Sequence, residues 1–277
     1  MNSPMVGFDT ISLYKHPDGI WADGADEFHN RGFLFGDGLF ETMVFVKGRI
    51  RFANHHNDRL VSGMRTLYLE ENGLSELSEI EVLLNEIWGD KKSLRVRWNV
   101  YRAGLGKYTP ETNTVIESLQ IHSFQPAPKL KEKACFSQNI HIQKTPWSHC
   151  KTLSALPYVM ANQERKSKGL DEVILTTPDG FISEAGASNL FWVRSGHYFT
   201  PSLETGCIAG VGRSKILDYL GENNIPFSEG LFKMEDLLKA DQILTSNVTG
   251  ISYLQSLENK NLDTHREKGL DSIFELN

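Results

Sequence analysis

Hydrophobic and polar positions along the first half of the chain predict strands and helices in alternation. Residues 41–52 alternate between apolar and polar side chains and turn at Lys47-Gly48, a pattern typical of a β-hairpin. Residues 54–70 then carry apolar side chains at helical spacing, and this helix is expected to begin near Asn57 or Asp58.

A second helix and further strands are predicted around these elements. Residues 76–88 are amphipathic at helical spacing, and residues 93–102 alternate as a strand does. Short strands with turns are predicted over residues 5–14 and 19–24. The apolar face expected for the second helix consists of Ile80, Leu83, Leu84 and Ile87.

The second half of the chain predicts a series of strands with helices between them. One helix is expected to start from a Ser154 cap, with Pro157 in its first turn, and to stop at Gly169. Another is entered through glycines over residues 210–220, and a short one covers residues 234–240. The predicted strands cover residues 134–142, 171–177, 181–185, 189–193, 197–200 and 241–247, with a turn at Pro178-Asp179-Gly180.

These elements predict an α/β (α+β) protein of two domains. Residues 124–133 contain two prolines and no periodicity, so they are the best candidate for a linker. We therefore expect a small N-terminal α/β domain over residues 1–122, an interdomain linker over 123–130, and a larger C-terminal domain over 131–277.

Composition narrows the classes of partner. The chain has 277 residues, of which 40% are hydrophobic and 23% charged, enough for a full core. Its formal net charge of −6 argues against nucleic acid as a partner. No apolar stretch is long enough to span a membrane and no secretion signal is recognisable, so a cytoplasmic protein that does not bind membranes is expected.

Cysteine and histidine spacing does not indicate a metal site. The three cysteines, Cys135, Cys150 and Cys207, are odd in number and widely spaced, without a C-x-x-C motif. His55 and His56 are adjacent, and adjacent residues on a helix do not face one point, so a solvated helix start is expected there. We predict no metal.

Lys151 opens an apolar run, although an ammonium group belongs in water unless it has a partner. A desolvated lysine loses basicity and becomes a nucleophile suited to forming a Schiff base. Taken alone, a lysine whose ammonium reaches the surface at the rim of the segment explains the pattern more simply.

Glu184, like Lys151, is a charged residue in an apolar segment, because the sequence is apolar on both sides of it. A carboxylate there needs a cationic partner or a proton. The pyridinium nitrogen of pyridoxal phosphate would serve, since the cofactor acts as an electron sink when an acidic residue keeps that nitrogen protonated. A carboxylate that caps a turn is an equal alternative on the sequence alone.

Two features could hold a phosphate. The glycines that precede the helix at residues 210–220 free backbone N–H groups that can point at an anion, and the helix dipole adds to the attraction. Arg59, on the early helix, could bind a phosphate through two N–H groups, although most helical arginines face solvent.

Five segments in this order resemble the class IV pyridoxal-phosphate enzymes, the fold-type IV group. That group includes branched-chain aminotransferases, D-amino acid aminotransferases and 4-amino-4-deoxychorismate lyases. The resemblance extends from about Gly24 to Tyr253, and SEAGASNLFW together with the upstream lysine is its most specific part. The segments are RGFLFGDGLFET, CKTLSALPYVMANQE, DGFISEAGASNLFWV, TPSLETGCIAGVGRSKIL and DQILTSN.

The resemblance implies a two-domain fold-type IV enzyme that uses pyridoxal 5'-phosphate, acts on a small-molecule amine and forms a homodimer. It implies that Lys151 forms the Schiff base and moves protons, and that Glu184 pairs with the pyridine nitrogen. The residues implied to bind the phosphate are Arg59, Val211 and Gly212, with Ser246 and Asn247 in a further phosphate-contacting loop.

Within the family, the sequence favours a 4-amino-4-deoxychorismate lyase, which releases pyruvate and leaves p-aminobenzoate. GDGLFET resembles the lyase form of its loop, and Thr42 falls where lyases carry a threonine suggested to assist proton transfer. A packed β-branched residue explains Thr42 equally well. Branched-chain enzymes usually carry a tyrosine where this chain has Leu156, and the Ser246-Asn247 pair is closer to lyases.

Other activities stay open. The chain lacks the glycine-rich stretch that many lyases carry after the strand at residues 93–102, so an aminotransferase acting on branched-chain or D-amino acids with 2-oxoglutarate is an alternative. A non-catalytic homologue is a second alternative. Arg97 and Arg102 would point to opposite faces of a strand, so we expect only one of them to reach the substrate carboxylate. The resemblance slightly favours Arg102, which falls where D-amino acid enzymes bind that group, over Arg97, which falls at a substrate-site position of branched-chain enzymes. Surface arginines on a strand explain either residue equally well.

Overall fold

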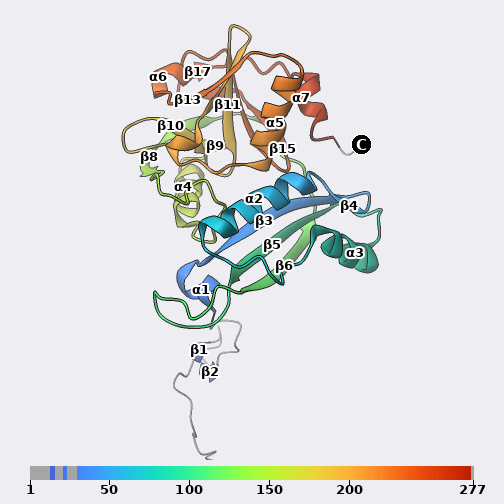
Figure 1. Ribbon diagram of the computed structural model, residues 1–277. Helices are drawn as coiled ribbons and strands as arrows, with labels where there is room; N and C mark the ends of the chain where they lie inside the picture. The colour runs from blue at the N-terminus through green and yellow to red at the C-terminus, as the bar shows by residue number, and fades with distance from the viewer. Residues whose placement is uncertain (1–12, 16–20, 24–29, 276–277) are drawn as a thin grey trace, which may run out of the picture.

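The structure is a computed structural model that describes residues 13–15, 21–23 and 30–275. It is a mixed α/β fold, as the sequence predicts, with sheets in both halves of the chain and helices around them (Figure 1). Two short strands near the start, β1 (Leu13–Lys15) and β2 (Trp21–Asp23), pair antiparallel. Other parts of the strands predicted over residues 5–14 and 19–24 lie outside the described residues.

The first half of the chain forms a four-stranded antiparallel sheet in the order β4-β3-β5-β6. The predicted hairpin turn at Lys47-Gly48 is confirmed, because Val46 pairs with Arg49 across it. The strand over residues 93–102 is confirmed as well. The strands are β3 (Gly38–Val46), β4 (Arg49–Ile50), β5 (Leu94–Arg102) and β6 (Val115–Ser123).

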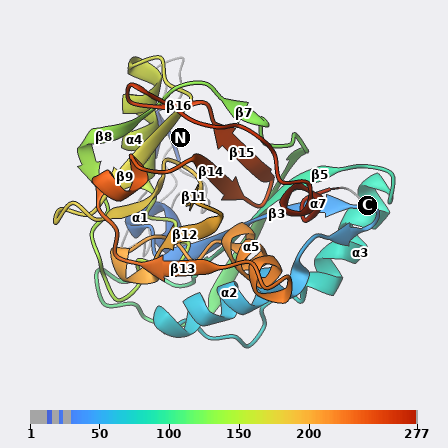
Figure 2. The same cartoon turned by 90° about the horizontal axis from the view of Figure 1, so that it is seen from above.

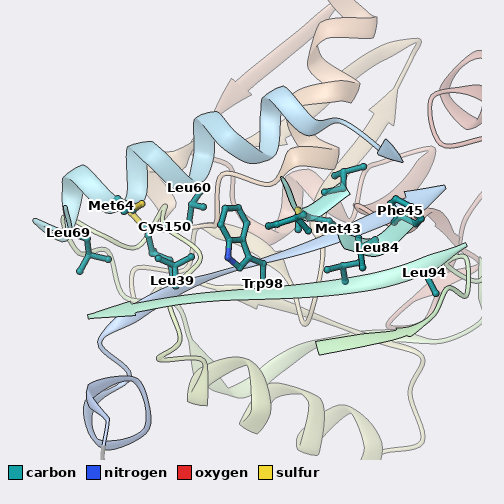
Figure 3. Packing of buried hydrophobic residues seen from close by; sticks show 14 residues of the cluster. Leu39, Met43, Phe45, Leu60, Met64, Leu69, Leu84, Leu94, Trp98 and Cys150 are labelled. Carbon is teal, nitrogen blue, oxygen red and sulfur yellow. The ribbon is translucent and has the colours of Figure 1, made fainter. Parts of the chain in front are cut away.

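Helices α2 (Ala53–Thr66) and α3 (Leu77–Trp88) pack on one face of this sheet, and the short α1 (Arg31–Phe35) precedes β3. In Figure 3, Leu60 and Met64 of α2 point toward Leu39, Met43 and Trp98 of the sheet, and all five side chains are buried. Alternation along β3 sends Phe40 and Thr42 to the opposite face, where they are available for a site.

Two details of these helices differ from the sequence-based prediction. Helix α2 begins at Ala53, before Asn57, because the chain turns into it through Phe52 in a left-handed conformation with φ of 60° and no side-chain cap. In α3, Ile80 and Leu84 are buried as expected, but Leu83 and Ile87 are 42% and 57% exposed, because the helix rests on the sheet by a narrower stripe.

The second half of the chain forms two larger sheets. One has six strands in the order β13-β12-β11-β14-β15-β7, and the other has five in the order β10-β9-β8-β16-β17. All of the strands predicted in this half are confirmed in outline. Their bounds are β7 (Leu130–Lys131), β8 (Ala134–His141), β9 (Glu172–Thr176), β10 (Ile182–Ala185), β11 (Asn189–Arg194), β12 (His197–Pro201), β13 (Phe227–Gly230), β14 (Gln242–Asn247), β15 (Gly250–Leu254), β16 (Ser256–Leu257) and β17 (Lys260–Asn261).

The helices of this half are α4 (Leu156–Ser167), α5 (Val211–Glu222), α6 (Met234–Leu237) and α7 (Lys268–Ser272), with a short 3-10 helix over Leu203–Thr205. Pro157 lies in the first turn of α4 and Gly169 follows its end with φ of 62°, as predicted. Ser154 does not cap this helix: the cap position is Ala155, and no side chain bonds the first turn.

Several contacts join the two halves of the chain. Helix α2 lies beside α5 in both views (Figure 1 and Figure 2). Arg51 donates to the carbonyl oxygens of Val248 and, at 2.7 Å, Phe274, and its guanidinium lies 5.3 Å from the Phe52 ring centroid. The strands of the four-stranded sheet come from residues 38–123 and those of the larger sheets from residues 130–261. No helix in the described part of the chain is both long and apolar enough to cross a membrane.

Candidate active site

Backbone pairing with β3 holds the segment that contains Lys151. The Phe40 amide donates to the carbonyl oxygen of Lys151 at 2.9 Å, and the Leu153 amide donates to Gly38 at 2.9 Å. Cys150, the preceding residue, is buried in the core between α2 and the sheet. The first residues of the apolar run after Lys151 therefore pair with the start of β3 and do not begin a helix. Helix α4 begins only at Leu156.

The amine of Lys151 lies above an aromatic ring in a strongly charged surrounding. Its Nζ is 4.4 Å from the centroid of the Phe40 ring. Burial, followed by the nearby Arg59, lowers the pKa of Lys151 to about 8, although Glu41 and Glu184 oppose the shift. A large fraction of this amine is therefore neutral near pH 8, as a nucleophile or proton carrier requires.

Arg59 reaches the site from α2 and is held by a buried carboxylate. Its Nε donates to Glu41 Oε1 at 2.8 Å, its Nη2 donates to Oε2, and its Nη1 donates to the Ala209 carbonyl at 3.2 Å. Burial alone would raise the pKa of Glu41, but Arg59 and His56 lower it to about 2. The carboxylate is therefore charged and fixes the plane of the guanidinium.

His56 is not at a solvated helix start, so the sequence-based expectation for the His55-His56 pair is wrong at this position. His56 is fully buried, and its Nδ1 lies 2.6 Å from Glu41 Oε2. Burial lowers its pKa, so the ring is neutral and donates through Nδ1 to the carboxylate. His55 is partly exposed beside Asp218, as a residue at a helix surface should be.

The start of α5 is shaped by two glycines that approach other side chains closely. A Cβ on Gly210 would lie 1.8 Å from Asn189 Oδ1, and a Cβ on Gly212 would lie 2.7 Å from Ser246 Oγ. No side chain caps this helix, so the N–H groups of its first turn, including those of Val211 and Gly212, are available to an anion. The carbonyl of Ala209, just before it, is bonded to Arg59.

Ser246 and Asn247, at the end of β14, behave differently. The Ser246 hydroxyl is buried and has no hydrogen-bond partner among the residues that the structure describes. The Asn247 side chain braces neighbouring turns, because its Nδ2 donates to Ser188 at 3.1 Å and its Oδ1 accepts from Thr249. Ser246 is therefore the side chain of this pair that is free to bind an anion.

A cavity of about 290 Å³ lies where α2, α5 and the Lys151 segment meet. Arg59, Ala209, Val211 and Ser214 line it, together with His149 and Cys150 beside Lys151. An arginine and a helix N-terminus thus meet at this cavity, and the Ser246 hydroxyl, unpartnered among the described residues, lies beside Gly212 in the first turn of the same helix. This combination is suited to a phosphate.

Glu184, on β10, is 3% exposed and has a hydrogen-bond donor that the sequence did not indicate. The Tyr158 hydroxyl of α4 donates to its Oε1 at 2.6 Å, and the Ile208 amide donates at 3.3 Å. Burial nevertheless raises the pKa of Glu184 to about 7. A cationic partner at this carboxylate would therefore be strongly favoured.

The face of the sheet that carries Phe40 also carries Thr42 and Arg97, which are direct neighbours on β3 and β5. The Arg97 guanidinium lies 3.7 Å from the centroid of the Phe40 ring, and its Nε donates to Asn99 at 2.7 Å. Its two Nη groups have no acceptor among the described residues. Thr42 is half-buried, and no partner for its hydroxyl is found among them either.

Arg102 lies on the face of the sheet opposite to Phe40 and Thr42, as the alternation requires, and its three nitrogens donate to groups on that face. Nε donates to Asp37 at 3.0 Å, Nη2 donates to the Leu67 carbonyl at 2.7 Å, and Nη1 donates to Asn113. The Asp37 carboxylate also pairs with Arg31 at 2.7 Å. This geometry supports Arg97 rather than Arg102 as the group that would bind a substrate carboxylate.

The residues that the sequence analysis did not assign to the site are Glu41, His56, Phe40 and Tyr158. Glu41 could have been found by the argument used for Glu184, because it too is a carboxylate within an apolar strand. The other three carry no comparable signal. They gain their importance only from contacts between segments that are distant along the chain.

The sequence profile of the family described as Amino-transferase class IV matches residues 38–255. An aminodeoxychorismate lyase from Bacillus subtilis (strain 168) is 27% identical over 241 residues, which are 84% of this chain and 81% of that protein. A D-alanine aminotransferase from Listeria monocytogenes serotype 1/2a is 25% identical over 239 residues, which are 82% of this chain and 80% of that protein.

The fold is shared with solved structures. The crystal structure of a branched-chain aminotransferase from the archaeon Thermoproteus uzoniensis superposes with a TM-score of 0.80 at 20% identity, and the match covers 95% of this chain and 92% of that one. At this identity the likeness concerns the fold alone.

Proposed function

We propose that this chain, which belongs to the class IV aminotransferase family and is therefore a pyridoxal-phosphate enzyme, is a 4-amino-4-deoxychorismate lyase. The reaction would release pyruvate from aminodeoxychorismate and leave p-aminobenzoate. One observation carries the choice of reaction: the Thr42 hydroxyl is unpartnered among the described residues, on the sheet face where Phe40 contacts the Lys151 amine.

The residues present fit pyridoxal phosphate. The buried Ser246 hydroxyl has no partner in the described part of the chain, and the absence of a side chain at Gly212 keeps α5 close to it. Arg59 and the first turn of α5 would hold the phosphate, Glu184 would pair with the pyridine nitrogen, and Lys151 would hold the cofactor through its amine. When bound, pyridoxal phosphate supplies an electron sink that stabilises negative charge on the substrate carbon beside the amine.

Lys151 would carry the proton of that substrate carbon. Because burial and Arg59 lower its pKa to about 8, its amine can take up a proton and return it near neutral pH. The Phe40 ring and the backbone bond between Phe40 and Lys151 hold the amine at the sheet face.

Thr42 would donate its hydroxyl proton to the oxygen of the departing enolpyruvyl group. It is the direct neighbour of Arg97 in the β3–β5 pairing, and the free Nη groups of Arg97 could orient a substrate carboxylate. A hydroxyl and a guanidinium on the same face can thus hold the leaving group and the carboxylate at the same time.

An aminotransferase is the second candidate. It is favoured by the D-alanine aminotransferase among the curated relatives, at 25% identity, against 27% for the lyase. An aminotransferase would use the same Lys151, Glu184 and Arg59 but would have no need of a proton donor at Thr42.

A paired assay on one preparation tests the proposal. One arm measures pyruvate and p-aminobenzoate formed from aminodeoxychorismate, and the other measures glutamate formed from 2-oxoglutarate with leucine, isoleucine or D-alanine. We expect turnover in the first arm. Rapid turnover in the second arm with none in the first would replace the lyase with the aminotransferase.

Variants at Thr42 sharpen the assay. Thr42→Val, which keeps the shape and removes the hydroxyl, should lower kcat for pyruvate release by about 100-fold, the range expected for a lost general acid. Thr42→Ser is the matched control, because it keeps the hydroxyl and should retain most of the activity. Equal loss in both variants would assign Thr42 to packing.

We also propose that the enzyme is a homodimer. Apolar side chains are exposed on two short stretches near the site, and a second copy would cover them. Light scattering of the purified protein tests this, with a single-chain mass as the contrary result. The exposed residues are Phe33, Leu34 and Phe35 of α1 and Leu156, Val159 and Met160 of α4.

A further inference from the structure

We infer that the Tyr158 hydroxyl favours the charged form of Glu184 and thereby makes the site select a cofactor ring whose nitrogen carries a proton. The inference rests on the proposed pairing of Glu184 with the pyridine nitrogen, and it adds a positioning residue to that pair. Tyr158 does not need to touch the reacting atoms for this role, because it acts through the carboxylate.

The hydrogen bond has the geometry of a strong, charge-assisted contact. The Tyr158 hydroxyl lies 2.6 Å from Glu184 Oε1, within the range typical of an O–H donor to a carboxylate. Such a bond favours the ionised acid, because a carboxylate oxygen accepts more strongly than the oxygen of a neutral carboxyl group. Oε2 accepts only a long bond from the Ile208 amide at 3.4 Å among the described residues, so it can receive a ring N–H.

Helix α4 fixes the position of the tyrosine. Tyr158 lies in the first turn, beside Pro157, and packs against the buried cluster of Ile142, Ala161, Val173 and Leu175. Asn162, four residues further on and so on the same side of the helix, donates at 2.8 Å to the carbonyl of Gly186. Two bonds from one helix face thus tie α4 to β10 and to the turn after it, and the hydroxyl has little freedom to leave the carboxylate.

Among the described residues, no other neutral donor of similar strength bonds to Glu184. The Cys207 thiol lies nearby and stays protonated, because burial raises its pKa to about 12, but it donates to the Ser202 carbonyl at 3.6 Å. Lys151 and Arg213 act on the carboxylate only through charge, and Arg213 is already paired with Glu229. Burial also raises the pKa of Tyr158, so the phenol remains a donor at every pH the protein tolerates.

The consequence is selectivity for the ring. A charged Glu184 that faces a protonated ring nitrogen is neutralised, whereas one that faces a C–H group is a buried charge without a partner. Without the hydroxyl, Glu184 accepts a proton more readily, so pairing with the nitrogen weakens and a C–H group is tolerated better. Tyr158 should therefore increase the ratio between the affinity for a ring that contains the protonated nitrogen and the affinity for a ring that has a C–H group in its place.

The test compares two ligands on the cofactor-free protein. One is pyridoxal phosphate, and the other is its carbocyclic analogue, in which a C–H group replaces the ring nitrogen. Dissociation constants for both are measured on the wild type and on Tyr158→Phe, which removes only the hydroxyl. We expect the ratio of the two constants to fall about tenfold in the variant, the value of one hydrogen bond to a charged group.

Each other outcome has a defined meaning. An equal loss of affinity for both ligands would make Tyr158 a packing residue and would overturn the inference. A wild type that binds both ligands alike would instead overturn the proposed pairing of Glu184 with the ring nitrogen, and Glu184→Gln should then bind both as the wild type does. The two failures are thus separate.

Tyr253→Phe is the matched control. It also removes one buried hydroxyl, which accepts a bond from the Glu267 amide at 3.1 Å, away from the site. Its ratio of dissociation constants should equal that of the wild type. If Tyr158→Phe does not fold, Tyr158→Gln restores an N–H donor. Recovery of the wild-type ratio in that variant supports the inference, and a ratio near one contradicts it.

Discussion

Lys151 and Phe40 meet twice, once through the backbone and once through their side chains. The Phe40 amide donates to the Lys151 carbonyl oxygen at 2.9 Å, and the Lys151 Nζ lies 4.4 Å from the centroid of the Phe40 ring. Because Phe40 belongs to the four-stranded sheet and Lys151 precedes α4, this pair joins the halves of the chain. A lysine that would be at the rim of an isolated segment is thereby brought inside.

Cofactor attachment at Lys151 should depend on pH in a way that reflects its lowered pKa. With a pKa of about 8 instead of 10.5, Lys151 presents about 300-fold more neutral amine at pH 7 than an ordinary lysine. The rate of attachment should therefore rise about tenfold from pH 6 to 7 and level off above about pH 8.5. Borohydride trapping followed by mass spectrometry measures it.

Lys151→Ala is the control for that experiment. It should show no trapped cofactor and neither lyase nor aminotransferase activity, because no other amine is placed against the Phe40 ring in the described part of the chain. Full activity in this variant, or attachment in the wild type that keeps rising to pH 10, would contradict the assignment.

Substitution of Arg97 should affect mainly catalysis, whereas substitution of Arg102 should affect mainly stability. Arg97→Gln should lower kcat/KM at least about tenfold by removing a charge-assisted bond to the substrate, with little effect on unfolding. Arg102→Gln should lower the free energy of unfolding by about 3 kcal/mol, since it leaves Asp37 with one fewer partner and frees the carbonyl of Leu67.

Urea unfolding and substrate titration on the same two variants decide between the arginines. If Arg102→Gln folded as stably as the wild type and lost substrate affinity, the slight preference for Arg102 that the sequence gives would stand. The contacts of Arg102 with the end of α2 argue for the opposite result.

Much of the fold was predictable because its signals are local. Alternation along residues 93–102 and the turn at Lys47-Gly48 are short-range patterns, and both are present in the structure. The start of α2 was not predictable in the same way. Phe52 adopts a left-handed conformation that its sequence does not favour, and it is held there by contacts with Phe274 at the far end of the chain.

The site was predictable only where one residue is chemically conspicuous by itself. Burying a lysine or a carboxylate within an apolar run costs free energy unless the charged group has a partner. Lys151 and Glu184 can therefore be recognised from the sequence as residues that need one. Tyr158 and His56 signal nothing alone, since a tyrosine on an amphipathic helix and a histidine at a helix start are common. Their roles follow from the carboxylates that the fold places against them.

Glu41→Gln should destabilise the cofactor-free protein, because the charge of Arg59 would lose its buried partner. We expect the free energy of unfolding to fall by about 3 kcal/mol. Inorganic phosphate should recover more stability in this variant than in the wild type, since the unpaired guanidinium then gains an anion. Urea unfolding with and without phosphate measures both effects.

Glu71→Gln is the matched control for Glu41→Gln, because Glu71 also pairs with an arginine, at 2.7 Å from Arg65, but on the surface. Exposed pairs contribute little, so this variant should unfold as the wild type does and should not respond specifically to phosphate. A similar response in both variants would show that phosphate acts on the protein generally rather than at Arg59.

Glu184 should make the cofactor-free protein less stable as the pH rises. Burial raises its pKa from 4.5 to about 7, so below pH 4.5 the group is protonated in both the folded and the unfolded chain and costs nothing. Between these values the unfolded chain loses the proton first, and about 3 kcal/mol of stability is lost by the time the pH passes 7. Glu184→Gln cannot ionise, so its free energy of unfolding relative to the wild type should increase by about that amount between pH 5 and pH 8.

Pyridoxal phosphate should cancel this pH-dependent loss of stability in the wild type, because a protonated ring nitrogen compensates the charge of Glu184. A wild type and variant that change in parallel with pH would show that Glu184 is solvated, which its 3% exposure contradicts.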